Sequence, residues 1–157
     1  MNTVSRLWST FLCFALVSGC TAPVRDAPVA APIDVAKMAN AERLSEKIGV
    51  PADVRYAFSG EVIAGVPAQL QVAIIPRTDG HNLNVEFPVT AGVALRKSVT
   101  TQAFGKASAA AAYRLSVEIS TDTRAPAKLP VIVSMDTADG RFFTVFGIPL
   151  RASGNTR

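Results

Sequence analysis

Apolar and polar residues alternate along most of the chain from about Asp53 onward. The alternation is clearest in NLNVEF, residues 82–87, where leucine, valine and phenylalanine interleave with two asparagines and a glutamate. Because successive side chains of a strand point to opposite faces, this pattern indicates a strand with one buried face and one solvated face. A similar pattern predicts strands in seven segments, which are 54–58, 68–75, 82–87, 93–99, 112–120, 129–135 and 141–150.

The connections between these segments also favour an all-β fold. Asp79-Gly80 and Asp139-Gly140 each lie between two of the segments and predict hairpin turns. In strand number and pattern, residues 53–151 resemble the immunoglobulin-like class, although they lack its Cys…Trp…Cys spacing. We therefore expect a seven-stranded antiparallel immunoglobulin-like β-sandwich, with a small closed barrel as the alternative.

Residues 34–49, DVAKMANAERLSEKIG, have a different pattern. Asp34 is a suitable N-cap, good helix formers follow, and Gly49 with Pro51 supplies a stop. The apolar residues of this segment fall on one side of a helix, so we expect a short amphipathic helix before the sandwich.

The last expected strand, RFFTVFGIPL, is apolar on both faces. Phe142 and Phe146 share one face, whereas Phe143 and Val145 share the other. One face belongs to the core, and the other must meet a second surface. We expect either that the 34–49 helix covers it, or that these four residues form an interaction surface for another protein, for which strand addition is one route.

The beginning of the chain has the features of a secretory signal. Arg6 supplies a positive charge, Leu7 to Leu16 are mostly apolar, and small residues follow at Ser18-Gly19. About ten apolar residues are too few to span a bilayer, which takes about twenty. We therefore expect residues 1–19 to be a signal peptide and not a transmembrane helix.

Val17-Ser18-Gly19-Cys20 resembles the lipobox of bacterial lipoproteins, in which an aliphatic residue and two small residues precede a cysteine. The resemblance implies cleavage after Gly19, lipidation of the Cys20 thiol and acylation of the new amino terminus. Several acyl chains on Cys20 would anchor the protein firmly in a bilayer. Because Thr21 stands where an aspartate tends to retain such lipoproteins in the inner membrane, the resemblance implies the outer membrane, facing the periplasm. An ordinary secretory signal cleaved elsewhere is the alternative.

The segments on either side of the sandwich are expected to be linkers or tails. Residues 20–33 form a Pro/Ala-rich tether in which prolines disfavour a packed helix. Residues 152–157 are expected to form a flexible C-terminal tail. Cys13 would leave with the signal peptide, so the mature chain would contain no disulfide.

Composition and charge exclude several classes of function. The formal net charge is +4, but the basic residues are scattered and no aromatic residues interleave with them, so we expect no nucleic-acid partner. His81 is the single histidine, and no GxSxG motif accompanies it, so we expect no catalytic residues. Asp136 and Asp139 flank a turn without the ligand density of a calcium loop, and we expect neither a metal nor a cofactor.

These expectations lead to one main hypothesis and one alternative. The main hypothesis is a non-enzymatic, lipid-anchored accessory module of the cell envelope, whose partners are the bilayer through Cys20 and an envelope protein. The alternative is a small apolar-ligand carrier with a pocket between the sheets, lined by Phe58, Phe87, Phe104 and Phe143.

Overall fold

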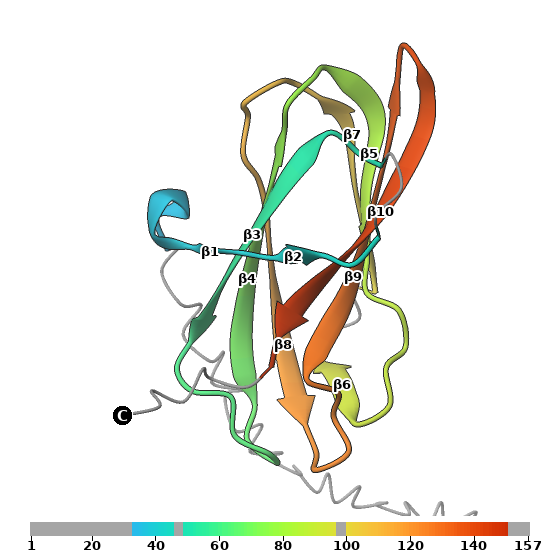
Figure 1. Ribbon diagram of the computed structural model, residues 1–157. Coiled ribbons are helices and arrows are strands. Elements are labelled where there is room, and N and C mark those ends of the chain that lie inside the picture. Colours follow the sequence, from blue (N-terminus) through green and yellow to red (C-terminus); the bar gives the residue numbers. More distant parts are fainter. Residues whose placement is uncertain (1–32, 46–48, 97–99, 151–157) are drawn as a thin grey trace, which may run out of the picture.

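The computed structural model describes residues 33–45, 49–96 and 100–150. Its strands form two antiparallel five-stranded sheets that pack against each other (Figure 1). Sheet A has the order β1-β3-β4-β8-β6, and sheet B has the order β2-β10-β9-β5-β7. The elements are the 3-10 helix η1 (Val35–Lys37) and the strands β1 (Ala39–Asn40), β2 (Glu42–Arg43), β3 (Ala52–Ser59), β4 (Ala68–Pro76), β5 (Gly80–Glu86), β6 (Val93–Arg96), β7 (Thr101–Ala107), β8 (Tyr113–Thr121), β9 (Lys128–Thr137) and β10 (Gly140–Pro149).

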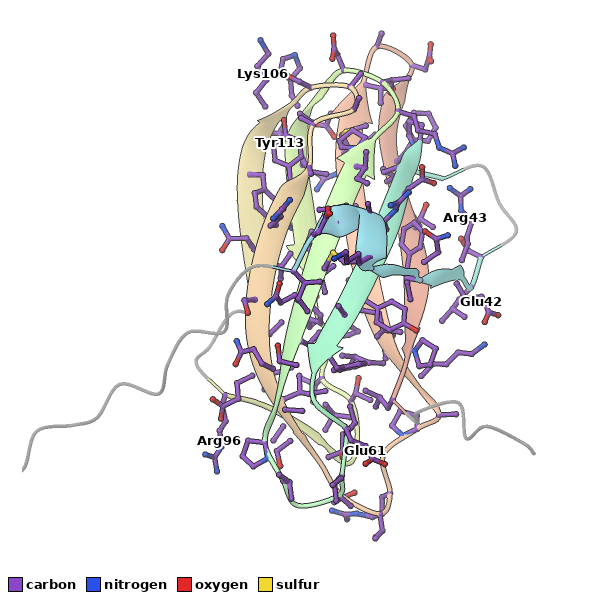
Figure 2. The ribbon with its side chains drawn as sticks, turned by 90° about the vertical axis from the view of Figure 1, so that its left-hand side faces the viewer. Glu42, Arg43, Glu61, Arg96, Lys106 and Tyr113 are labelled. Carbon is purple, nitrogen blue, oxygen red and sulfur yellow. The ribbon has the colours of Figure 1, made fainter. Side chains whose placement is uncertain are left out.

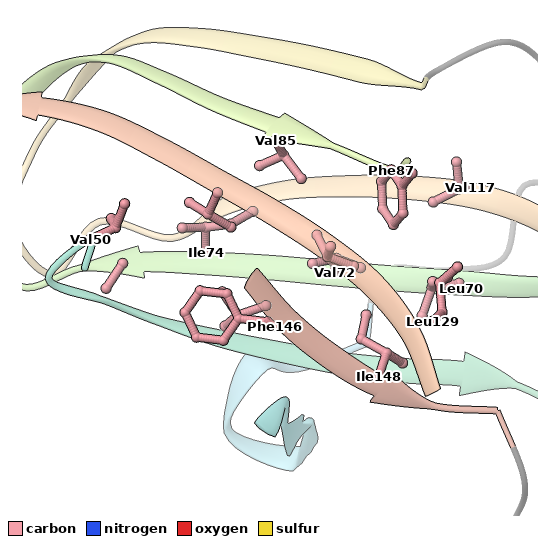
Figure 3. Close-up of a cluster of buried hydrophobic side chains, with 14 of the residues drawn as sticks. Val50, Leu70, Val72, Ile74, Val85, Phe87, Val117, Leu129, Phe146 and Ile148 are labelled. Atoms are coloured by element: carbon pink, nitrogen blue, oxygen red, sulfur yellow. The ribbon is translucent and has the colours of Figure 1, made fainter. Parts of the chain in front are cut away.

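Alternate side chains of the two sheets fill the space between them. Leu70 and Ile74 of β4 and Val85 of β5 are completely buried in one cluster (Figure 3). Phe87, which follows β5, is only 1% exposed and is among the largest buried side chains. The all-β prediction is confirmed, and the two separately hydrogen-bonded sheets exclude the closed-barrel alternative.

Each of the seven predicted segments contains a strand, but the predicted number of seven strands is wrong because the described residues form ten. The additional strands are β1, β2 and β7. In β7 the sequence TQAFGKA shows little alternation, and Gly105 has a φ of 70°, which is unusual in a regular strand. Its pairing with β5 is irregular at Leu83, so tertiary pairing rather than local pattern forms this strand.

Residues 39–44 form a strap that joins the two sheets along one side of the sandwich (Figure 1). In β1, Asn40 lies opposite Arg55 of sheet A. Three residues later in β2, Arg43 lies opposite Phe146 of sheet B. The strap therefore gives each sheet one more strand at this side.

The predicted amphipathic helix over residues 34–49 is wrong for the described part of that segment. Only Val35–Lys37 is helical, as a single 3-10 turn whose N-cap is Asp34, and the chain then enters β1. Gly49, the expected helix stop, lies against β10. A Cβ at Gly49 would lie 1.9 Å from Oγ1 of Thr144, so glycine is required by the close approach of β10.

The turn η1 lies over the outer face of sheet A, which is the face turned away from sheet B (Figure 2). The Ile33 N–H donates to Oε1 of Gln71 at 2.9 Å, and Nη1 of Arg55 donates to the Val35 carbonyl at 3.1 Å. Because η1 covers this face, Ala73 is fully buried although its side chain points away from the core.

Of the two predicted hairpins, one is confirmed and one is wrong. β9 and β10 form a hairpin in which Gly140, with a φ of 125°, pairs with Thr137. Asp79-Gly80 instead lies where the chain crosses from β4 in sheet A to β5 in sheet B. A Cβ at Gly80 would lie 2.6 Å from the Asp136 carbonyl oxygen, so close packing and not a turn requires this glycine.

The signal peptide (residues 1–19), Cys20, all of the tether before Ile33, and the tail (residues 152–157) lie outside the described residues. Within the part of the chain that is described, no helix is long and apolar enough to cross a membrane.

Candidate protein interface

The structure separates the four residues that the sequence placed at an interaction surface. Phe146 is 3% exposed and Phe142 packs against the core cluster, so both face sheet A. Phe143 and Val145 point to the outer face of sheet B, and Phe143 is 70% exposed. Phe143 and Val145 are therefore available to a partner, whereas Phe142 and Phe146 belong to the core.

Neighbouring strands extend this outer face into an apolar strip, which consists of Leu44, Pro130, Ile132, Phe143 and Val145. Val145 lies opposite Ile132, and Gly147 lies opposite Pro130. A Cβ at Gly147 would lie 3.0 Å from Cδ2 of Leu44, which shows that Leu44 occupies the space above this glycine. Leu44 itself remains 46% exposed.

Charged pairs stand at both ends of the apolar strip. At the hairpin end, Nε of Arg141 lies 3.7 Å from Oδ1 of Asp136. At the other end, Nζ of Lys128 lies 2.5 Å from Oε2 of Glu42 on the strap. An apolar centre with a charged rim is the usual composition of a protein interface.

The strip ends at β5, the next strand of sheet B. The outward residues of β5 that lie beside β9 are Asn84 and Glu86, opposite Ser134 and Ile132 respectively. The apolar strip therefore follows the β9–β10 hairpin and the strap, and it does not cover the whole sheet.

The expected covering of the last strand by residues 34–49 is wrong in the described part of that segment. β2 pairs with the edge of β10 at Phe146 and Gly147, and the Leu44 N–H donates to the Val145 carbonyl at 2.9 Å. These contacts lie beside the strand and leave the Phe143 ring exposed.

The residues considered for catalysis or metal binding lie on β5, on β9 and, for Asp139, in the turn between β9 and β10. His81 is exposed and lies opposite Asp136. Nδ2 of Asn82, which has a φ of 52°, donates to Oδ2 of Asp136 at 2.7 Å. Among the residues that the structure describes, no group of three or more His, Cys, Asp or Glu side chains is placed to hold a metal ion.

The four phenylalanines that were expected to line a common pocket do not converge. Phe58 packs edge-on against Tyr56, and Phe104 packs edge-on against Tyr113, with ring centroids 5.9 Å and 5.5 Å apart. Phe87 borders an apolar hollow of about 230 Å³, which Leu95 and Leu129 also line. Phe143 lies on the outside of sheet B, so this pocket prediction is wrong.

The sequence itself marks two of the strip residues. Pro130 and Ile132 lie on the outward parity of LPVIVSM, which marks them as apolar residues on a face expected to be wet. The local pattern predicts a helix at Leu44, and only the pairing of β2 with β10 places it beside them.

No protein-family model matches the chain, and no curated protein matches it either.

Proposed function

We propose that this protein is a non-enzymatic lipoprotein of the bacterial envelope, anchored in the outer membrane and facing the periplasm, which docks another envelope protein on the apolar strip. The support for the anchor is the lipobox-like sequence that ends at Cys20, behind a signal-like segment. A lipid anchor would confine the domain to one membrane surface and raise its effective concentration near a partner held there.

The observation that carries the docking function is the exposed ring of Phe143. A phenylalanine that is 70% exposed on a sheet face costs solubility and contributes little to folding. Val145 and Ile132 continue the apolar surface beside it, and two charged pairs bound it. Buried aromatic residues at the centre of an interface commonly dominate its binding energy.

We further propose that the sandwich belongs to the immunoglobulin-like class, and strand order is the support. That class has one sheet in the order A-B-E-D and a second sheet that contains C-F-G. When β3, β4, β5, β6, β8, β9 and β10 are assigned A to G in chain order, sheet A contains A-B-E-D and sheet B contains G-F-C. Three strands remain outside this assignment: β1 and β2 belong to the strap, and β7 is an addition beside strand C.

A direct test of docking replaces Phe143 with serine and uses Val89→Ser as the matched control. Val89 is 98% exposed in the loop before β6, outside the strip, so both changes remove an exposed apolar side chain. We expect Phe143→Ser to weaken binding of the partner by about tenfold or more, as loss of a central aromatic residue does. The urea midpoint should stay close to that of the unchanged protein for both variants.

Site-specific photo-cross-linking in intact cells identifies the partner for that measurement. A photoreactive side chain at position 143 should give one discrete adduct, and the same group at position 89 should not give it. Equal adducts from both positions, or a partner whose affinity is the same for Phe143→Ser and Val89→Ser, would rule out docking on the strip.

A small apolar-ligand carrier remains a second candidate, and the hollow beside Phe87 is the observation in its favour. Its volume of about 230 Å³ is below the usual range for ligand pockets, about 300–1,000 Å³. The exposed strip is therefore the stronger basis for a function.

A further inference from the structure

Arginines from three different elements line one cavity beside the strap. The cavity has a volume of about 340 Å³, and its wall includes Arg43 of β2, Arg55 of β3 and Arg77, which follows β4. Asn40 of β1 also lines it, and Figure 2 labels Arg43 on the strap. The cavity therefore lies between the strap and β3, and no residue of the apolar strip lines it.

Asp53 is the single carboxylate among the residues that line this cavity, and it is already engaged. It accepts hydrogen bonds from Nη2 and Nε of Arg77, at 2.5 Å and 3.2 Å. This two-point contact neutralises Arg77. The residues that line the cavity, three arginines and one aspartate among them, have a net charge of +2.

The charges of Arg43 and Arg55 have no carboxylate partner among the described residues. Nη2 of Arg43 donates to the Val50 carbonyl, and Nη1 of Arg55 donates to the Val35 carbonyl, each at 3.1 Å. A backbone carbonyl holds a guanidinium group in place but carries no net charge. Glu42, the neighbour of Arg43 on the strap, pairs instead with Lys128.

Both arginines are held in position before any ligand arrives. The guanidinium carbon of Arg43 lies 5.9 Å from the centre of the Phe146 ring, within the range of a cation–π contact. Each guanidinium group has five N–H donors, and the backbone contacts use one from each. The remaining donors form planar forks of the kind that bind oxyanions.

We propose that this cavity binds a phosphate group, as inorganic phosphate or as a phosphomonoester. A phosphate monoester carries about −2 at neutral pH, which matches the +2 of the wall. The bound phosphate bridges Arg43 on the strap and Arg55 on β3, so it fastens the strap to sheet A. This binding site is independent of docking on the apolar strip.

The test is a titration of the purified full-length protein with inorganic phosphate at constant ionic strength and pH 7, followed by calorimetry. The variants are Arg43→Gln and Arg43→Lys, and the matched control is Arg114→Gln. Arg114 is an exposed arginine on the outer side of β8 that does not line the cavity. Each glutamine variant therefore removes one positive charge from the domain.

We expect saturable binding that Arg43→Gln weakens by about tenfold or more, because a hydrogen bond to a charged group is lost. Arg43→Lys should bind with an intermediate affinity because it keeps the charge and loses the fork. Arg114→Gln should bind as tightly as the unchanged protein. Phosphate should also slow hydrogen exchange of the Ala41 and Leu44 amides, since both belong to the strap.

Absence of saturable binding, or the same affinity for Arg43→Gln and Arg114→Gln, would overturn the proposal. Hydrogen exchange measured without phosphate shows whether the Arg43→Gln variant remains folded. If it does not, the phosphate affinity of the Arg43→Lys variant is compared with that of Arg114→Gln instead. A parallel titration with glycerol phosphate distinguishes the sources of the ligand. Tighter binding of glycerol phosphate than of inorganic phosphate supports a lipid headgroup, and weaker binding supports the free anion.

Discussion

Thr144 shows how one polar side chain can hold two distant parts of the chain together. It is fully buried on the core-facing side of β10, next in parity to Phe142 and Phe146. Its Oγ1 accepts a hydrogen bond from the Val50 N–H at 2.8 Å. This bond fixes the point at which the chain returns from the strap and enters β3.

Replacement of Thr144 with valine should destabilise the fold by about 1–3 kcal/mol, because the buried Val50 N–H loses its acceptor. Valine has nearly the same shape, so the loss reports the hydrogen bond. Urea unfolding measures the stability, and hydrogen exchange at the Val50 amide locates the change.

The control for this substitution is Thr144→Ser, which keeps the hydroxyl group and removes one methyl group. It should cost about 1 kcal/mol of stability but leave the Val50 amide protected. Equal protection of Val50 in the valine and serine variants would show that Thr144 does not hold this amide.

At the residue scale, the sequence predicted which way the side chains of the last strand point. It did not predict why glycine is required at particular positions. The alternation in RFFTVFGIPL correctly separated Phe142 and Phe146 from Phe143 and Val145. The local pattern predicts a helix stop at Gly49 and a hairpin residue at Gly80. The actual reason is contact with distant backbone or side-chain atoms, which no local pattern encodes.

The strap is the element for which local propensity and tertiary structure disagree most. DVAKMANAERLSEKIG contains good helix formers, but residues 39–44 pair with the edges of both sheets. Helix propensities differ by less than about 1 kcal/mol per residue, so pairing and burial can override them. Met38, which directly precedes the strap, is only 7% exposed, so this conformation also buries an apolar side chain.

Substitution of Ala41 with proline tests the pairing of the strap. The Ala41 N–H donates to the Val54 carbonyl at 2.8 Å, and proline has no N–H. Loss of one net hydrogen bond, about 0.5–1.5 kcal/mol, should raise local opening about two- to tenfold. Hydrogen exchange at the Leu44 amide, which bonds to Val145 of the next sheet, measures this opening.

Ala41→Gly provides the control because it keeps the N–H and removes the methyl group. The exchange rate at Leu44 should rise clearly more for the proline variant than for the glycine variant. If proline leaves the Leu44 amide as protected as in the unchanged protein, the strap is not held by the Ala41–Val54 bond.

Most elements of the sandwich were predicted because their alternation is strong and local. The exceptions have physical reasons: β1 and β2 are two residues long, and β7 is interrupted by Gly105. The sequence also could not predict where the chain crosses from one sheet to the other. An Asp-Gly pair is compatible with a hairpin and, as at Gly80, with a crossing.

At the scale of the whole molecule, the sequence predicted two layers and the apolar last strand, but not the surface that results. The apolar strip combines residues from the strap, β9 and β10, and only pairing between these distant segments brings Leu44 beside the hairpin. The arginine cavity was not predicted for the same reason, because its arginines come from β2, β3 and the end of β4.

The proposed lipid anchor makes a prediction for the whole protein in the cell. Cys20→Ala removes the thiol that would carry the lipid, so the protein should leave the membrane fraction or accumulate as an unprocessed precursor. Fractionation of cells with immunoblotting measures both outcomes, and metabolic labelling with a fatty acid analogue should label the unchanged protein alone.

Cys13→Ala is the matched control because it removes the other cysteine of the chain from the expected apolar stretch of the signal. This variant should be processed, labelled and retained in the membrane like the unchanged protein. A Cys20→Ala protein that remained labelled and fully membrane-bound would exclude Cys20 as the attachment point.

The arrangement of the strap determines how the domain would respond to mechanical force. A pull on Ile33 from the preceding chain reaches the hydrogen bond to Gln71 first, then the bond from Arg55 to the Val35 carbonyl, and then the short pairing of β1 with β3. Only after these contacts break does the load pass to the pairing of β2 with β10 on the opposite sheet. The two attachments therefore break in series, and a tethered domain would yield by peeling of the strap while the buried core stays intact.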